Sequence, residues 1–405
     1  MSTKRIDRHS ALKRLMAHAQ AIEPELVSPV EAVGRVAARD IAAKGDVPEH
    51  ASSLRDGYAV RTPDIATADR APVRLAVSRT IRAESADAGT ILPGEAVRVL
   101  TGGMVPLGAD AVLAEEDVTE FDGAIEVSEP ENPGWFVRPP GGEVPAGAPV
   151  VAAGSIITPQ AAAVLMRAGA SALPTCPIPR VRAFALGSEL ADPEDPHPPA
   201  SARFLADNLI LVGGLLHRAG VDVVETGVLP DKPETVTAAL AAEQPELVIT
   251  SGGTGRSERD FALQSAKAAG FTILFNGVDI RPGRNVFGAV RGGTLLLGLP
   301  GPPSAVFACL HAIVLPLLRH LRGLTAPMEP LIANVDQGFS VRPGPEWVVP
   351  VTLRREGPEL VATPLIDKGL PPLLAVSLAH GAALLKGGQG LLPGDNATVV
   401  SVCLD

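Results

Sequence analysis

In the middle of the chain, short strand-like runs alternate with segments whose apolar residues have helical spacing. This alternation constrains the fold more than any other feature. Three short apolar runs rich in β-branched residues predict strands; they are RVRAFALG (180–187), VDVVETGVL (221–229) and ELVITS (246–251). The two segments between them, 205–220 and 231–244, have helical spacing. A β-α-β-α-β order predicts a parallel sheet with right-handed crossovers, and hence an α/β domain.

The third of these runs leads directly into a glycine turn, Ser251-Gly252-Gly253-Thr254-Gly255. Ligands of parallel α/β sheets bind at the carboxyl ends of the strands, and the backbone N–H groups of such a turn can cradle an anion. A second glycine turn, GLPGPPSA (298–305), follows an apolar run and precedes a helix, a position that favours phosphate binding. Gly301 and Ser304 belong to this second turn.

A pair of arginines lies on a Pro-Gly turn, IRPGRN (280–285). Arg281 and Arg284 could be an ordinary solvated surface pair. Two guanidinium groups on one rigid turn also suit a phosphate or another oxyanion. Together with the two glycine turns in the same α/β domain, the pair favours a phosphorylated small molecule as the ligand.

The remainder of the chain predicts mostly β structure. A chain of 405 residues is too long for one core, so we expect two to four domains. Short β-type runs separated by glycine and proline fill residues 55–150 and 329–405, which predicts two small β domains. Ser28-Pro29-Val30-Glu31 has the cap, the proline and the glutamate of a helix start.

Charge and cysteine content limit the classes of function. The formal net charge of −10 argues against a nucleic-acid-binding surface. Three widely spaced cysteines without a CxxC pair favour a reducing compartment and give no zinc motif. The N-terminus is charged where a signal peptide would be apolar, and no stretch approaches the roughly 18 uninterrupted apolar residues of a membrane span. We therefore expect a cytoplasmic protein.

Three acidic segments each allow two interpretations. DGYAV (56–60), DAVLAEED (110–117) and GSELADPED (187–195) place carboxylates at turns or strand ends. Such carboxylates are most often solvated, and an Asp-Gly pair is most often a turn, whereas metal ligation is the less common alternative. From the residues alone both interpretations stay open.

The order of the motifs is more specific than any single motif. Between residues 56 and 303 the chain carries, in this order, DGYAV, TGG-x-x-P-x-GADAV, GSEL, ITSGG, RPGR and GLPG-x-P. This series resembles the molybdopterin molybdenumtransferases, the family of MoeA and the gephyrin E-domain. The resemblance runs through essentially the whole chain.

The resemblance implies a multidomain α/β plus β fold and a homodimer. Its four domains would be an elongated N-terminal domain (1–50 with 140–178), an inserted β domain (51–139), a molybdopterin-binding α/β domain with a parallel sheet (179–326) and a C-terminal β domain (327–405). It also implies a site between the α/β domain of one subunit and the N-terminal domains of the other. Other cofactor-assembly proteins are possible partners, whereas nucleic acid and membrane are not.

The activity that the resemblance implies is the Mg²⁺-dependent insertion of molybdate into adenylylated molybdopterin, with release of AMP. Matching motif positions suggest catalytic and metal-binding carboxylates at Asp56, Glu189 and Asp260. A carboxylate beside a pyrophosphate is reasonable if it holds Mg²⁺, because like charges would otherwise repel. The positions suggested for ligand binding are Thr101, Ser251, Gly252, Gly253, Arg281, Arg284, Gly301 and Ser304.

Several positions inside these motifs depart from the family's usual residues. Ser188 stands where the family usually has an acidic residue, and Glu143 stands where it has an aspartate. Arg281 and Arg284 replace two lysines, which keeps the charge but exchanges a mobile point charge for a planar fork. Asn285 replaces a proline.

These departures leave two alternatives to the transferase. Fewer carboxylates favour a diverged paralogue that binds molybdopterin or the finished cofactor as a carrier or sensor, without insertion chemistry. A hydrolase acting on another nucleotide pyrophosphate is a third hypothesis. The retained Asp56 and Asp260 favour the transferase.

Overall fold

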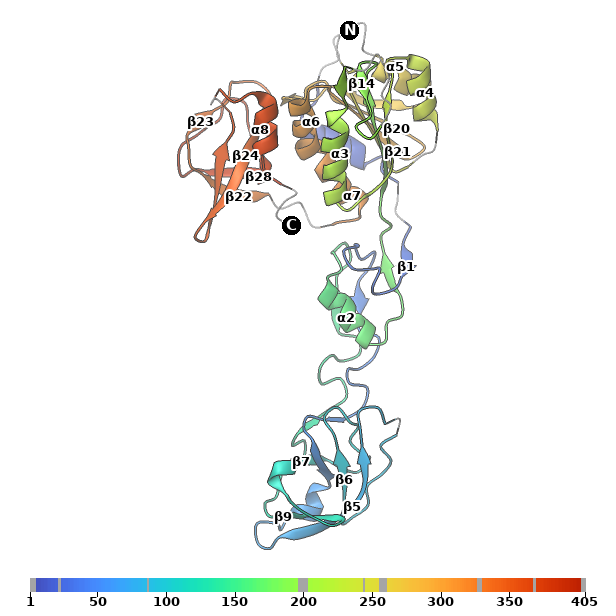
Figure 1. Ribbon diagram of the computed structural model, residues 1–405, viewed down its shortest axis with the longest axis vertical. Helices are drawn as coiled ribbons and strands as arrows, with labels where there is room; N and C mark the ends of the chain where they lie inside the picture. The colour runs from blue at the N-terminus through green and yellow to red at the C-terminus, as the bar shows by residue number, and fades with distance from the viewer. Residues whose placement is uncertain are drawn as a thin grey trace. The chain divides into compact units, whose positions relative to one another are not determined.

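The structure is a computed structural model that describes residues 5–20, 23–85, 87–195, 203–242, 245–254, 261–325, 330–366 and 369–401 (Figure 1). The chain divides into two compact units, one of residues 26–174 and one of residues 1–25 with 175–405. An α/β layer structure and several β-sheets are present, as the predicted multidomain α/β plus β fold requires.

A six-stranded sheet forms the centre of the larger unit, in the order β16-β13-β17-β21-β20-β18. The strands are β13 (Arg180–Leu186), β16 (Asp222–Leu229), β17 (Leu247–Ser251), β18 (Thr272–Asn276), β20 (Phe287–Arg291) and β21 (Thr294–Leu299). The first four strands of the sheet are parallel, as predicted. Strand β20 runs antiparallel to both of its neighbours, an arrangement that the strand and helix periods of the sequence did not predict.

A tight hairpin between β20 and β21 explains this reversal. Arg291 pairs with Thr294, so only Gly292 and Gly293 form the connection. Both glycines have positive φ, 55° and 91°. Two-residue hairpin turns of type I′ need positive φ at both central positions, and a Gly-Gly pair meets this requirement without strain.

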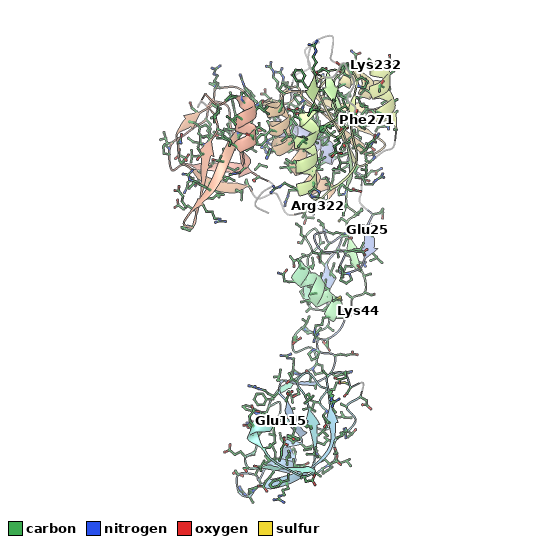
Figure 2. All side chains as sticks on the ribbon, viewed as in Figure 1. Glu25, Lys44, Glu115, Lys232, Phe271 and Arg322 are labelled. Atoms are coloured by element: carbon green, nitrogen blue, oxygen red, sulfur yellow. The ribbon has the colours of Figure 1, made fainter. Side chains whose placement is uncertain are left out.

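Helices cover both faces of the sheet (Figure 1). On one face, α4 (Pro233–Ala241) and α5 (Ala262–Ala268) pack with Phe271, which Figure 2 labels. On the other face lie α1 (Arg8–Met16), α3 (Asp207–Arg218) and a long helical segment, 303–321. Helix α1 therefore packs in this core, whereas the domain bounds implied by the resemblance put residues 1–50 in the elongated domain.

The segment 303–321 consists of α6 (Pro303–Cys309), a π-helical turn η3 (Leu310–Val314) and α7 (Leu315–Leu321). The π-turn lies directly before Pro316, which lacks the N–H that an α-helix would use there. Within the described residues this is the one helix long and apolar enough to cross a membrane, with a mean hydropathy of 1.6. Since 78% of that stretch is buried inside the protein, it has the character of a core helix.

A second six-stranded sheet follows in the C-terminal region, in the order β19-β24-β25-β22-β28-β26. Its strands are β19 (Ile280–Arg281), β22 (Leu331–Val335), β24 (Glu346–Glu356), β25 (Glu359–Pro364), β26 (Gly381–Leu385) and β28 (Asn396–Val400). The short strands β23 (Phe339–Ser340) and β27 (Gly390–Leu391) pair beside it, and α8 (Pro372–Leu378) contacts α6. Strand β19 is the beginning of the arginine turn, and its pairing with β24 attaches this turn to the C-terminal sheet.

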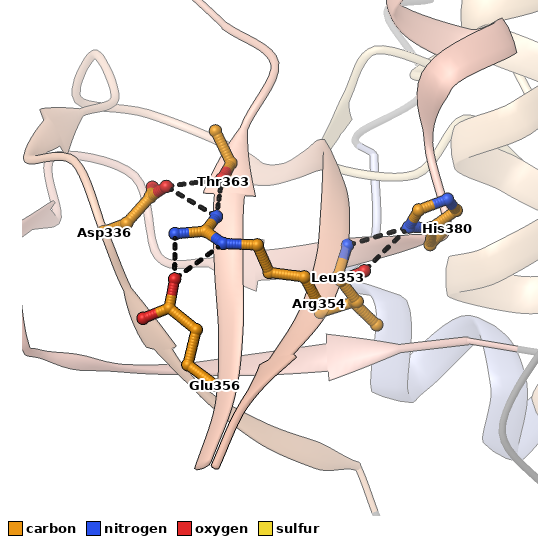
Figure 3. A network of polar contacts seen from close by, with 6 residues as sticks. All are labelled: Asp336, Leu353, Arg354, Glu356, Thr363 and His380. Carbon is orange, nitrogen blue, oxygen red and sulfur yellow. Dashed lines mark hydrogen bonds and ion pairs between the residues drawn. The ribbon is translucent and has the colours of Figure 1, made fainter.

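Polar contacts join neighbouring strands of this sheet (Figure 3). Arg354 on β24 donates to Asp336 at 2.8 Å and to the Thr363 hydroxyl at 2.7 Å, and it pairs with Glu356 at 2.9 Å. The imidazole of His380 accepts a hydrogen bond from Leu353 N at 2.9 Å. These contacts link residues of neighbouring strands on the surface of the sheet.

The smaller unit contains a third six-stranded sheet, in the order β7-β4-β6-β5-β9-β8. Its strands are β4 (Gly57–Val60), β5 (Val73–Ile81), β6 (Glu95–Val99), β7 (Ala111–Ala114), β8 (Thr119–Phe121) and β9 (Ala124–Val127). An ion pair at 2.5 Å joins Arg98 to Glu115, which Figure 2 labels.

The rest of the smaller unit is built from short strand pairs and one helix. The pairs are β1 (Glu25–Val27) with β12 (Leu173–Thr175), β2 (Ile41–Ala42) with β11 (Pro149–Val151), and β3 (Ser52–Ser53) with β10 (Val137–Arg138); the helix is α2 (Pro159–Arg167). The buried residues around α2 form their own apolar cluster, separate from the cluster inside the sheet.

Candidate functional site

A cavity of about 340 Å³ opens where β13, β17 and β21 end. Its walls include Leu186, the glycine turn 251–254, the second glycine turn at 300–302 and the start of α3. Carboxyl ends of parallel strands and a helix N-terminus therefore meet in one place, which is where ligands of open α/β sheets bind. We call this space the glycine cavity.

Backbone geometry fixes the two glycine turns beside each other. Gly252 has a φ of 97°, and a Cβ atom on it would lie 2.5 Å from the Leu186 carbonyl oxygen, so this position excludes every other residue. Its N–H donates to Leu299 O at 3.0 Å, which ties the first turn to the end of β21. A Cβ atom on Gly301 would lie 3.9 Å from the Gly252 Cα. The cavity wall is thus main chain that a ligand can approach closely.

Asn208, near the start of α3, connects the helix to the second turn. Its Nδ2 donates to Gly301 O at 2.8 Å, and the side chain is only 8% exposed. Its Oδ1 is buried and accepts no hydrogen bond from any described residue. A buried acceptor without a partner is costly, so this oxygen is a candidate contact for an N–H or O–H group of a ligand.

The charged groups in the glycine cavity are carboxylates. Glu189, Asp207 and Asp231 line it, and no lysine or arginine does so among the described residues. The Asp231 N–H donates to Ser188 Oγ at 2.9 Å, so the serine that replaces an acidic residue positions another carboxylate at the cavity. An anionic ligand here needs a cation to offset these charges.

This donor set fits a magnesium ion that is shared with the ligand's phosphates, and not one that the protein alone surrounds. Mg²⁺ commonly binds through one or two carboxylates together with substrate phosphates and waters. Among the described residues no three His, Cys, Asp or Glu side chains are grouped as a complete metal site. The carboxylates of the glycine cavity can therefore share Mg²⁺ with a phosphorylated ligand, but they do not enclose it.

Arg281 and Arg284 line a second cavity, of about 380 Å³, and not the glycine cavity. This cavity is also lined by Arg5, Asp279 and Pro345. We call it the arginine pocket. The Arg281 guanidinium lies over the Trp347 ring, 4.9 Å from its centre, which restrains the orientation of the charge.

The arginine turn also reaches the glycine cavity through Asn285, which lines it. Helix α6 supports the turn from below: Cys309 Sγ donates to Gly283 O at 3.6 Å, and a Cβ atom on Gly283 would lie 2.7 Å from that sulfur. Burial raises the pKa of the Cys309 thiol, so the group stays a neutral donor. One turn therefore contributes to both cavities.

Asp56 and Thr101 are in direct contact in the smaller unit. The Thr101 N–H and hydroxyl both donate to Asp56 Oδ1, at 2.6 Å and 2.8 Å. The backbone hydrogen bond, followed by the hydroxyl hydrogen bond, lowers the pKa of this exposed carboxyl below its ordinary value. The two motif residues thus form one ionised, oriented carboxylate.

Glu143 already has partners in the same unit. Its carboxylate forms an ion pair with Arg138 and lies 3.9 Å from Arg167. It would have to leave these arginines to ligate a metal, so the structure gives Glu143 a structural contact rather than an open coordination position.

The residues expected from the sequence thus fall into separate groups. Glu189, Ser251, Gly252, Gly253 and Gly301 share the glycine cavity. Ser304 lies in the first turn of α6 and lines neither cavity, and Asp260 lies outside the described residues.

Sequence reasoning did not assign a role to several cavity residues. Asn208, Asp231, Phe261 and Asn285 all line the glycine cavity. The available signal was their position: each lies within a few residues of a strand end or a helix start that faces the carboxyl edge of the sheet.

Fold and site together define a small-molecule-binding α/β protein with additional β domains. Residues 6–169 match the family model described as the MoeA N-terminal region (domain I and II). Residues 183–320 match the model described as a probable molybdopterin binding domain.

Relatives and solved structures extend the match over the chain. "Molybdopterin molybdenumtransferase 2" of Mycobacterium tuberculosis is 31% identical over 77% of this chain and 78% of its own length. The molybdopterin molybdenumtransferase of Staphylococcus aureus is 27% identical over 96% of this chain and 94% of its own length. The crystal structure of the molybdopterin biosynthesis MoeA protein of Pyrococcus horikoshii superposes with a TM-score of 0.84 at 26% identity, covering 98% of this chain and 99% of that one. The chain belongs to the MoeA family of molybdopterin molybdenumtransferases.

Proposed function

We propose that this protein inserts molybdate into adenylylated molybdopterin in a Mg²⁺-dependent reaction that releases AMP. Family membership supports the transferase class. The observation that carries the proposal is the glycine cavity, where main-chain turns for phosphate meet carboxylates for a divalent ion. We further propose a cytoplasmic homodimer, because the family resemblance implies one.

The residues of the glycine cavity would hold the ligand. Ser251, Gly252, Gly253 and Gly301 present a close-approach surface to its phosphates. Ser304, in the first turn of α6 and outside the cavity lining, is proposed as a further phosphate contact. The Asn208 Oδ1 atom would accept a hydrogen bond from the ligand, which satisfies an otherwise unpaired buried atom.

The carboxylates would manage Mg²⁺, which when bound neutralises charge that develops on the pyrophosphate during cleavage. Glu189 and Asp260 are proposed ligands from one subunit. Asp56, whose ionised form is held by Thr101, is proposed as a ligand from the other subunit of the homodimer. Arg281 and Arg284 bind a phosphate or the molybdate substrate in the arginine pocket.

The decisive experiment measures AMP release by the purified protein with adenylylated molybdopterin, molybdate and Mg²⁺. We expect release that requires both molybdate and Mg²⁺, and that falls at least tenfold in Glu189→Gln, because an amide is a poorer ligand for Mg²⁺. Asp122→Asn removes an exposed carboxylate elsewhere in the protein and serves as the control.

Tight binding of the adenylylate without any AMP release would instead identify a carrier or sensor. No observation on the cavity favours that alternative, and the relatives described above are named as transferases.

A further inference from the structure

Arg5 reaches the arginine pocket from the opposite end of the sequence. Ile6 forms a parallel bridge with Val278; its N–H donates to Gly277 O at 3.3 Å, and its carbonyl accepts from Asp279 N at 2.8 Å. These bonds fix the backbone next to Arg5 along the segment that leads into the arginine turn. The side chain is therefore presented by an anchored strand-like segment.

The side chain of Arg5 has a defined path as well. A Cβ atom on Gly277 would lie 3.0 Å from Arg5 Cγ and 3.6 Å from Cδ, so the methylene groups of Arg5 cover the bare Cα of this glycine. Long basic side chains commonly lay their stem on such a surface and project the charged group beyond it. Arg5 is one of the residues that line the arginine pocket.

The pocket holds more positive than negative charge. Three arginines and one aspartate, Asp279, line it. No ion pair joins Arg5, Arg281 or Arg284 to another described residue; Arg281 instead stacks on Trp347. Nearby Arg8, by contrast, is paired with both oxygens of Glu346, at 2.7 Å and 3.1 Å. The three unpaired guanidiniums thus have hydrogen-bond donors available for an anion.

We propose that Arg5 is a further binding residue of this pocket: together with Arg281 and Arg284 it binds a doubly charged tetrahedral oxyanion, either free or as a phosphate of a larger ligand. The inference rests on the proposed anion-binding role of the arginine turn and adds a third donor group from the N-terminal segment. Three planar forks around one anion favour a dianion over a monoanion of similar size.

Calorimetric titration of the full chain with molybdate, and separately with sulfate, tests this inference. We expect Arg5→Gln to weaken binding of either dianion about tenfold, as for loss of one charge-assisted hydrogen bond. Arg5→Lys keeps the charge and should lose less, whereas Asp279→Asn should tighten binding. Arg355→Gln removes an exposed arginine of β24 outside the pocket and should leave binding unchanged.

A double variant separates a shared anion from two independent effects. If Arg5 and Arg284 contact the same anion, the combined loss in Arg5→Gln/Arg284→Gln will differ from the sum of the single losses. If Arg5→Gln proves unstable, Arg5→Lys and Asp279→Asn test the same charge without that difficulty.

Titration with adenylylated molybdopterin identifies the source of the anion. A loss in Arg5→Gln with molybdate and sulfate indicates a free oxyanion, and a loss with the adenylylate alone indicates its phosphate. Unchanged binding of all three, or no binding of any by the wild type, would overturn the inference. Oxyanion binding that depends on Arg5 without AMP release would leave it intact while refuting the proposed transferase activity.

Discussion

The glycine cavity and the arginine pocket differ in what their walls are made of. Main chain forms much of the glycine cavity, and its charged side chains are the carboxylates Glu189, Asp207 and Asp231. Long cationic side chains form the arginine pocket, including Arg281 and Arg284. The fold fixes the shape of the glycine cavity, whereas side chains supply the charge of the arginine pocket.

This difference assigns different tasks to the two spaces. A main-chain wall selects a ligand by shape and by N–H direction, and under the proposed function its carboxylates share a divalent ion with the phosphate. A guanidinium wall attracts an anion directly. Because Asn285 lines one cavity and the adjacent Arg284 lines the other, a single turn can couple their occupancy.

Helix 303–321 adjoins both spaces, because it follows the second glycine turn and its Cys309 contacts Gly283 of the arginine turn. Protonation of a buried histidine in this helix gives the largest predicted effect. His311 lies in the π-turn, 6% exposed, and burial lowers its pKa from 6.5 to about 4. The folded protein therefore keeps this histidine neutral while the unfolded chain takes up a proton below about pH 6.5. The contribution of neutral His311 to the free energy of unfolding is fully present above that pH. It is lost as the pH drops toward 4, by about 3 kcal/mol in total.

Urea unfolding between pH 7 and pH 4 checks this prediction in the wild type and in His311→Leu. The variant should lack this part of the pH dependence, since it has no group to protonate. Parallel curves for the two proteins would show that His311 is not the group that responds. Ligand binding in both spaces should weaken together in the wild type as the helix loosens.

The substitution Gly301→Val should separate the two spaces. A Cβ atom at this position lies 3.9 Å from Gly252 Cα, an ordinary contact, but the methyl groups of valine would fill the gap between the two turns. We expect binding of adenylylated molybdopterin to fall about a hundredfold, roughly 2.7 kcal/mol, with oxyanion binding at the arginine pocket unchanged. Gly301→Ala is the matched control and should bind nearly normally; equal loss in both variants would contradict the proposed wall.

The glycine cavity could be predicted from the sequence because its determinants are local. A β-type run followed directly by Ser251-Gly252-Gly253 gives the strand end, the turn and the need for positive φ within a few residues. The parallel order of β13, β16 and β17 follows from the alternation of strand and helix periods.

The arginine pocket could not be predicted, because distant segments build it. Strand β19 leaves the α/β region to pair with β24, and Arg5 arrives from the N-terminus. No local pattern encodes either event. The helix start predicted at Ser28 fails for a related reason: the Ser28–Glu31 hydrogen bonds of a capping box form, at 3.1 Å and 3.3 Å, but Gly34 at a φ of 81° ends the turn and no helix follows.

Removal of one arginine from the turn should have a smaller and more selective effect than Gly301→Val. We expect Arg281→Ala and Arg284→Ala each to weaken binding of molybdopterin or its adenylylate by about 2 kcal/mol, as for loss of a charge-assisted hydrogen bond. Arg355→Ala removes an exposed arginine outside the pocket and should have no effect. Calorimetry decides the outcome, and unchanged affinity in both turn variants would make the pair a solvated surface feature.

The smallest predicted effect concerns Asp56, whose carboxylate is kept ionised mainly by its hydrogen bonds from Thr101. Because Thr101 lowers the pKa of Asp56 below 3.8, the folded state favours the ionised carboxyl. This contribution is present above the unfolded pKa and is lost as the pH falls through the folded value. Asp56→Asn should therefore lower the unfolding midpoint slightly at pH 7, and the difference from wild type should shrink as the pH falls below 3.8. Asp122→Asn, an exposed aspartate of the same β region, should show no such pH-dependent difference. An Asp56→Asn deficit that stays constant from pH 7 to pH 3 would mean that shape, and not charge, holds Asp56 against Thr101.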